Sequence, residues 1–328
     1  MSRKRVRILC EISVFLQKGG HGMAQNVTTK LEDLNLTDRF LFDETMENRE
    51  AYEATVSILL ENEIELLERP ETEKEFRVSP ELRAIRLDVI SMDRDKILYY
   101  TEMQNKNTGN LLKRSRYYQA HLDVSLLEPG CLDFNALNDS FLIMIAPFDL
   151  FGKGLYRYTF EGTCRECPEL KLGDGAVKVF INTKGTNRED FSEEFLDFME
   201  YLNHTSDEVA GRTKSKRIKQ IYETVKKVKA SEKIGVKYMQ LWEEMALARE
   251  EAKEEGRAEG RTEGKAANFI VLICKKLKKN KSVEEIAEEL ETDFAIVQDI
   301  CEVARPFAPE FDENKVFEAW KKKKWVSN

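Results

Sequence analysis

Three polar side chains, Asp88, Glu102 and Gln104, interrupt two apolar runs in the segment RLDVISMDRDKILYYTEMQ. Both runs are typical of strands, and a three-residue turn at 93–95 would join them into a hairpin. With this turn Asp88 faces Tyr100 and is the diagonal neighbour of Glu102, with Cα atoms about 7 to 8 Å apart. Because strand side chains alternate between faces, the three polar side chains share one face of the hairpin.

Two carboxylates at this separation repel each other unless a cation lies between them. Their hard oxygen atoms suit Mg²⁺ or Mn²⁺. Such an ion would lower the pKa of a bound water and neutralise the charge that develops on a phosphodiester. The spacing of Asp88 and Glu102 therefore indicates a metal site for phosphodiester hydrolysis. The same pattern also fits an ordinary half-exposed hairpin whose polar residues face solvent.

Helices and strands alternate around this hairpin. Asn48 is a candidate cap for a helix whose apolar positions, Tyr52, Val56 and Leu59 among them, follow helical spacing. A second helix is predicted in NTGNLLKRSRYYQAHLDVSLLEPG, directly after the hairpin. Further strands are predicted in ETEKEFRVS, FLIMIAP, LYRYTFEG and AVKVFINTKG. This order predicts an α/β core with a mixed sheet, followed by a helical C-terminal extension.

Changes in composition divide the chain of 328 residues into four segments. An N-terminal tail covers 1–30, and its first 22 residues are either a spurious upstream start before Met23 or a flexible tail. The α/β domain covers 31–186. A charged helical extension covers 187–267 and contains EEGRAEGRTEGK, whose glycines recur every four residues. This repeat indicates a spacer or an oligomerisation helix, and a small helical module covers 268–328.

The C-terminal module has the pattern of two short helices. Ser282 and Glu285 are spaced as a capping box, and Pro306 marks a stop. The pair resembles a helix-turn-helix, but the second helix carries Asp299 and Glu302, which would repel phosphate. A structural or pairing module is therefore favoured over a DNA reader. The closing WKKKKW is interpreted as a frayed basic tail.

Composition indicates where in the cell the protein is located, but it says little about the molecules that the protein binds. No run of 18 apolar residues is present, and no small-residue cleavage site follows the short apolar run near the N-terminus. Six scattered cysteines form no regular disulfide framework. We therefore expect a cytoplasmic protein with no membrane partner. The net charge of −8 argues against a generally basic coat but permits a local basic groove.

Several ordered motifs carry a resemblance to a known family: LTDRFLFDETM, RLDV, YTEMQNK, LLKRSRYYQAHLDVSLLEPG, LNDSFLIMIAPFDLFGKGLYRYTFE and LGDGAVKVFINTKG. Over roughly residues 35 to 265 the chain resembles the Rpn family of recombination-promoting nucleases, also described as putative transposases. That family belongs to the PD-(D/E)XK nuclease superfamily. The resemblance implies a restriction-endonuclease-like core and Mg²⁺-dependent endonuclease action on DNA. The metal ligands would be Asp88 and Glu102.

The resemblance also assigns roles to other positions and shows one departure. Gln104 stands where the superfamily has a lysine, and an amide can only hydrogen-bond and position a water rather than deprotonate it. Asp38, in LTDRF, is matched to the acid that the first core helix contributes, with Asp43 and Glu53 as nearby competitors. The match of Gln104 to this family's EMQ form is compatible with an active enzyme.

The helix after the hairpin carries Lys113, Arg114 and Arg116. These side chains are candidates for sequence-independent contact with the DNA backbone, and the alternative is a solvated helix face. Two hypotheses follow for the whole chain. One is a metal-dependent DNA endonuclease acting in recombination or on mobile DNA, with a possible homo-oligomer through its C-terminal helices. The other is a non-catalytic DNA-binding or assembly protein that keeps a relic nuclease core.

Overall fold

The computed structural model describes residues 29–67, 69–76, 85–127 and 130–326. These residues form two compact units, which are divided between Trp242 and Glu243. All of the predicted N-terminal tail except residues 29 and 30 lies outside the described residues. Among the helices that are described, none combines the length and apolar character that a membrane crossing requires.

A mixed six-stranded sheet with the order β1-β2-β3-β4-β6-β5 forms the centre of the described part of the first unit. The strands are β1 (Glu71–Phe76), β2 (Ile85–Met92), β3 (Leu98–Met103), β4 (Ser140–Ala146), β5 (Arg157–Phe160) and β6 (Ala176–Asn182). The first three strands run antiparallel, β4 pairs parallel with β3 and β6, and β5 pairs antiparallel with β6. The predicted α/β class with a mixed sheet is confirmed.

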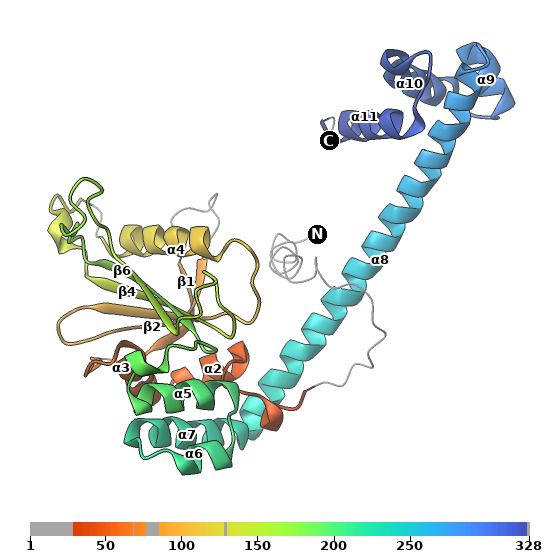
Figure 1. Cartoon of the computed structure of the whole chain (residues 1–328). Helices are drawn as coiled ribbons and strands as arrows, with labels where there is room; N and C mark the ends of the chain where they lie inside the picture. The colour runs from red at the N-terminus through yellow and green to blue at the C-terminus, as the bar shows by residue number, and fades with distance from the viewer. Residues whose placement is uncertain (1–28, 68, 77–84, 128–129, 327–328) are drawn as a thin grey trace. The chain divides into compact units, whose positions relative to one another are not determined.

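Helices cover both faces of this sheet, with α4 on one side and α2, α3, α5 and α7 on the other (Figure 1). Their bounds are α2 (Arg39–Met46), α3 (Arg49–Leu60), α4 (Leu111–Leu126), α5 (Glu193–Asn203), α6 (Asp207–Arg212) and α7 (Lys216–Lys229). Asn48 caps α3 as predicted, because its side chain accepts a hydrogen bond of 3.0 Å from the Ala51 backbone N. Tyr52, Val56 and Leu59 are fully buried.

Buried hydrogen bonds fix β3 to the helix on each of its faces. On one face the Tyr52 hydroxyl of α3 lies 2.9 Å from Thr101 Oγ1. On the other face the Tyr100 hydroxyl donates to Gln119 Oε1 of α4 at 2.7 Å, and Gln119 Nε2 donates to Ser140 Oγ of β4 at 2.9 Å. Because α4 is the crossover between the parallel strands β3 and β4, this network sets where the start of α4 lies over the sheet.

The hairpin between β2 and β3 differs from the prediction by one residue at its turn. The Asp93 backbone N donates to the Ile97 carbonyl at 3.1 Å, so the turn holds residues 94–96 rather than 93–95. The Asp93 side chain is the cause: Oδ1 accepts from the backbone N of Asp95 and of Ile97, each at 2.9 Å. Lys96 takes the left-handed position of such a turn, with φ of 62°.

This shift moves the whole register by two residues. Val89 pairs with Thr101, and the next position along the strands therefore brings Asp88 opposite Glu102. The predicted pairing of Asp88 with Tyr100 was wrong, and the two acids face each other directly instead of diagonally. The prediction that they occupy adjacent strands is confirmed.

The first unit extends beyond residue 186, where the α/β domain was predicted to end. Helices α5 and α7 and the first turns of α8 (Glu232–Leu277) contribute Phe198, Ile221 and Tyr238 to the same hydrophobic cluster as the sheet. The charged surface of this segment suggested a separate extension, but every third or fourth residue is apolar and packs onto the core. The compact unit therefore continues to Trp242.

The second unit contains the remainder of α8 and the helices α9 (Val283–Glu289), α10 (Phe294–Ala304) and α11 (Glu313–Val326). The predicted capping box is present, with Ser282 and Glu285 bonded reciprocally. The repeat EEGRAEGRTEGK lies within α8, and a Cβ atom added at Gly256, Gly260 or Gly264 would meet nothing within 4 Å. Close packing within the described chain thus does not account for these glycines, and the oligomerisation helix stays a prediction.

The closing basic segment belongs to α11 rather than to a frayed tail. Lys321 forms an ion pair with Glu263 of α8 at 2.6 Å, and Lys323 pairs with Asp299 of α10 at the same distance. Val316 of α11 is fully buried in the core that α8, α9 and α10 share. These contacts explain why the segment is helical, because they hold the helix against its neighbours.

The side chain of Asp93 is predicted to control the stability of the hairpin. Asp93→Ala removes the acceptors for two turn amides and for the Tyr99 hydroxyl, which donates to Asp93 Oδ2 at 2.8 Å. We expect the free energy of unfolding, measured with urea, to fall by about 3 kcal/mol. The exposed neighbour provides the control, since Asp95→Ala should cost less than about 0.5 kcal/mol. Equal effects of the two substitutions would contradict this account.

Candidate functional site

Asp88 and Glu102 lie where the ladder between β2 and β3 ends. The last residue pair of this ladder is Val89 with Thr101. Beyond this pair, side-chain carboxylates rather than backbone carbonyls accept the hydrogen bonds of the backbone amides. The Asp88 backbone N donates to Glu102 Oε1 at 3.2 Å, and the Met103 backbone N donates to Asp88 Oδ2 at 3.0 Å. Each carboxylate thus satisfies an amide close to the other, and the two side chains are 0% and 2% exposed.

Gln104 extends the site along β3. Its side-chain Nε2 donates to Glu102 Oε2 at 3.1 Å, and its backbone N donates to the Ile145 carbonyl of β4 at 2.8 Å. The hydrogen bond to Ile145 continues the pairing of β3 with β4 and fixes the position of the residue. The structure therefore brings together all three polar residues that the hairpin pattern singled out.

Two arginines approach the carboxylates from different helices. Arg39, at the start of α2, forms an ion pair with Asp88 Oδ1, and its Nε lies 3.5 Å from Asp43 Oδ2. Arg114, in the first turn of α4, places Nη2 3.9 Å from Glu102 Oε2. The site therefore contains three acidic side chains and two guanidinium groups.

Burial raises the pKa values of these acids. Loss of water contact and the neighbouring Asp88 raise the pKa of Glu102 from 4.5 to about 8, although Arg39 and Arg114 oppose the shift. Burial is also the first cause of the raised pKa of Asp88, and Arg39 again opposes it. The pKa of Asp43 is raised by burial and then by Asp88. At neutral pH the buried cluster therefore retains at least one proton.

Asp38 does not join this cluster. It is the N-cap of α2, where its Oδ1 accepts from the backbone N of Phe40 at 3.0 Å and of Leu41 at 3.4 Å. The geometry therefore gives no support to the predicted role of Asp38, and its neighbour Asp43 lies in the cluster instead. Asp43 lies one turn further along α2, on the face that meets the sheet, and is 5% exposed.

Glu53, the other competitor, has a structural role. Its Oε2 accepts from the Leu66 backbone N at 2.9 Å and lies 3.7 Å from the guanidinium of Arg49. Glu53 therefore fixes the segment that follows α3.

The three basic residues of α4 divide into two kinds. Lys113 and Arg116 are exposed, as expected for residues that contact a nucleic acid backbone. Arg114 is turned inward, with its side chain 25% exposed and its guanidinium 5.5 Å from the ring centre of Tyr118. Its Nε and Nη2 atoms are buried and have no hydrogen-bond acceptor among the described residues.

The sequence pattern did not indicate Arg39. It follows the cap Asp38 and precedes an apolar run, so it has the appearance of an ordinary surface residue at the start of a helix. Its contact with Asp88 spans 49 positions of the sequence, and only the packing of α2 against β2 creates it. The sequence indicated Asp43 only as a nearby competitor of Asp38.

Unsatisfied oxygen atoms test whether this site suits a cation. Oδ1 of Asp43 accepts no hydrogen bond in the described structure, and Oδ1 of Asp88 meets only the Arg39 ion pair. No three acidic, histidine or cysteine side chains among the described residues form a complete set of metal ligands. Mg²⁺ does not require such a set, because one or two carboxylates and several waters commonly hold it. The donors present therefore fit a hard divalent ion.

Comparison of the chain with protein-family models, curated proteins and solved structures finds no match. The resemblance to the Rpn family therefore stays a prediction, and the site is interpreted from its own geometry.

The pKa of Glu102 predicts how stability depends on pH. An acid whose pKa is higher in the folded state binds more protons there, so the free energy of unfolding falls as pH rises from about 4.5 to about 8. Glu102→Gln keeps the shape of the side chain but cannot ionise, so we expect a weaker decline. Urea unfolding across this pH range measures the difference. Equal slopes for the two proteins would mean that Glu102 does not titrate in this window.

Proposed function

We propose that this protein is a metal-dependent endonuclease that hydrolyses phosphodiester bonds in DNA, acting in recombination or on mobile DNA. The observation that carries the proposal is the pair of buried carboxylates, Asp88 and Glu102, at the end of the β2–β3 ladder. A pair that costs stability when ionised is expected where a divalent cation compensates the charge. The PD-(D/E)XK resemblance implies the same two residues.

Asp88 and Glu102 would hold Mg²⁺ or Mn²⁺. The ion would supply an activated water and neutralise charge on the phosphate. Burial of the two carboxylates strengthens their attraction for a cation, because few water molecules compete with it. Binding of the ion would require the proton of the cluster to leave.

Gln104 and Arg114 would divide the work that a single lysine performs in the superfamily pattern. The Gln104 amide is held by Glu102 and can position a water or a phosphate oxygen by hydrogen bonding. It cannot provide charge. Arg114 is a permanent cation beside the same carboxylate, with two buried N–H groups that lack acceptors. Phosphate oxygens are suitable acceptors for a guanidinium, so Arg114 would stabilise the charge that Gln104 cannot.

One observation favours the second candidate, a non-catalytic protein that keeps a relic nuclease core. Arg39 already occupies Asp88 Oδ1, and a guanidinium there does part of what a metal ion would do. The active-site proposal requires Arg39 to move away when a metal binds. Its side chain is 47% exposed, so a movement toward solvent is sterically open. A relic would instead keep Arg39 in place at any metal concentration.

A plasmid-cleavage assay with and without Mg²⁺ separates these candidates. The wild-type protein should cleave only with the ion, and Glu102→Gln should reduce cleavage at least a hundredfold, because one ligand charge is lost. The melting temperature of this variant should be unchanged or higher, since it relieves the repulsion between two buried acids. Cleavage by the variant at the wild-type rate would refute the site.

Matched amides on α2 control this assay. Asn is as good a helix cap as Asp, so Asp38→Asn should preserve both the fold and cleavage. Asp43→Asn should lower cleavage, because it removes a charge from the cluster around Arg39. Loss of cleavage in Asp38→Asn with normal activity in Asp43→Asn would reverse our correction of the sequence prediction.

Adjacent residues of α4 separate DNA binding from chemistry. Lys113→Gln should weaken DNA binding without changing the cleavage rate at saturating DNA, because the side chain is exposed and forms no ion pair with the carboxylates. Arg114→Gln should lower the saturated rate by about tenfold to a hundredfold, as loss of one charge-stabilising group does. Single-turnover cleavage and fluorescence anisotropy measure the two quantities. Identical behaviour of the variants would show that Arg114 only binds.

A further inference from the structure

A concentration of positive charge lies on α7, away from the carboxylate site. Residues 213–233 hold eight lysines or arginines against two glutamates, although the chain as a whole has a net charge of −8. Six lysines of this segment are exposed: Lys214, Lys216, Lys219, Lys226, Lys227 and Lys233. Arg217 differs from them, because it is paired with Glu63 and Glu194.

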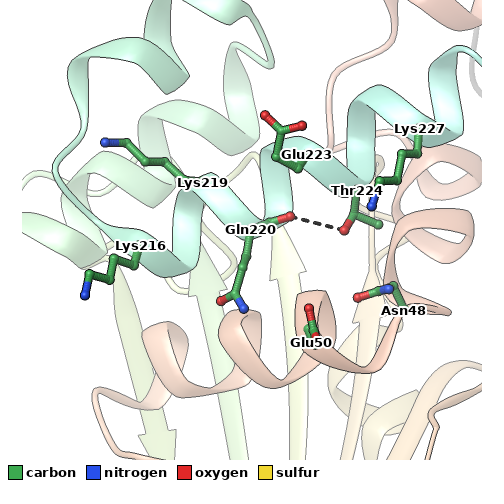
Figure 2. Close-up of a pocket in the computed structure, with 8 residues that line it drawn as sticks. All are labelled: Asn48, Glu50, Lys216, Lys219, Gln220, Glu223, Thr224 and Lys227. Carbon is green, nitrogen blue, oxygen red and sulfur yellow. Dashed lines mark hydrogen bonds between the residues drawn. The ribbon is translucent and has the colours of Figure 1, made fainter.

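Three of these lysines share one face of α7. Lys216, Lys219 and Lys227 line a hollow of about 320 Å³ between α7 and the start of α3 (Figure 2). Gln220 and Thr224 lie on the same face and add uncharged polar groups, and Glu50 and Glu223 are its two acids. Among the described residues the three ammonium groups form no ion pair, and with the two acids they leave the hollow a net charge of +1.

The opposite face of α7 is committed to the core. Ile218, Ile221, Val225 and Val228 belong to the main hydrophobic cluster and are at most 5% exposed. The helix therefore cannot turn an apolar face toward a membrane or into the groove of a partner protein. The lysine face also lacks the buried aromatic or aliphatic anchors that dominate protein–protein affinity. What remains is a polar, cationic and rigid surface.

We infer that the lysine face of α7 (Lys216, Lys219 and Lys227) binds the phosphate backbone of duplex DNA, as a second contact separate from the carboxylate site. The three lysines span about 16 Å of helix axis, a length over which one strand of duplex carries about five phosphates. Lysine suits this role because it acts as a point charge without the fork that reads bases. This inference extends the proposed function and assumes the same nucleic acid.

The C-terminal segment at residues 275–281 is a second lysine-rich stretch, and three of its five lysines form ion pairs. Lys276 and Lys281 both pair with Glu289, and Lys278 pairs with Glu313 at 3.0 Å. These two carboxylates offset part of the positive charge of the segment, and Lys275 and Lys279 are exposed. The lysines of α7 are preferred because all three line one hollow and none of them forms an ion pair among the described residues.

The test measures DNA binding without cleavage. In the full-length Glu102→Gln protein, without divalent metal, the affinity for a fluorescein-labelled duplex is measured by anisotropy across a salt series. Combining Lys216→Gln, Lys219→Gln and Lys227→Gln should reduce the slope of log K against log salt by up to about 0.9 per lysine. Between about 50 and 200 mM salt the parent should then lose about fortyfold more affinity than the triple variant.

A second triple variant controls for the loss of net charge. Lys153, Lys184 and Lys265 are exposed lysines outside α7 and outside residues 275–281, and their replacement by Gln should leave the slope unchanged. Both triple variants should keep the parent melting temperature, which excludes misfolding as the cause.

Three outcomes would overturn the inference. An unchanged slope in the α7 variant, with DNA binding intact in the parent, rejects this surface but leaves the proposed nuclease site standing. Equal losses in the two triple variants show a general charge effect. Absence of DNA binding by the parent protein rejects both the surface and the DNA substrate. Binding to anionic lipid is measured separately, by sedimentation of the protein with phosphatidylserine vesicles. If the protein binds these vesicles through the α7 lysines but does not bind DNA, the lysine face binds anionic lipid.

Discussion

Burial of negative charge at the end of the β2–β3 ladder is the constraint around which the first unit is arranged. Two carboxylates removed from water cost several kcal/mol each unless cations or hydrogen bonds compensate them. Asp88 and Glu102 obtain amide partners from each other's strands, and guanidinium groups arrive from α2 and α4. The helices on both faces of the sheet thus participate in one electrostatic cluster.

The same constraint explains why the anchoring of β3 matters for the site. Tyr52 fixes α3 on one face, and the bonds of Gln119 to Tyr100 and Ser140 fix α4 on the other. Arg114 lies five residues before Gln119 on α4, so the polar network limits how far its guanidinium can move from Glu102. A loosely packed helix would leave the carboxylate without a nearby cation. The distances in the cluster are therefore a product of packing well outside it.

Negative and positive charges occupy different regions of the first unit, which the net charge of the chain does not reveal. The acids of the carboxylate site are buried and partly neutralised, whereas Lys216, Lys219 and Lys227 of α7 are exposed and without ion pairs among the described residues. Hydrophobic packing of α7 produces this exposure, because burial of its apolar face directs the remaining positions outward. A chain with an overall negative charge can in this way present a positive surface.

Local patterns in the sequence determined where helices and strands form and which polar residues share one face of the β2–β3 hairpin. The cap at Asn48, the capping box at Ser282 and the strand segments were predictable, because they depend on neighbouring residues and on regular periodicity. The convergence of Asp88, Glu102 and Gln104 was also predictable, since strand alternation places them on one face. The register was not, because the Asp93 side chain decides which residues form the turn.

Tertiary structure alone decided the rest. Arg39 pairs with both Asp43 and Asp88, and its contact with Asp88 exists only because α2 packs across β2; no local pattern encodes a contact between residues so distant in sequence. Asp38 had the residue type of a site acid, but its position before the first turn of α2 made it a cap. The first unit extends to Trp242 because the apolar faces of α5 and α7 pack into the main hydrophobic cluster. That packing is likewise a property of the tertiary structure. Periodicity specifies that a helix has an apolar face, whereas the elements that bury this face are defined only in the folded chain.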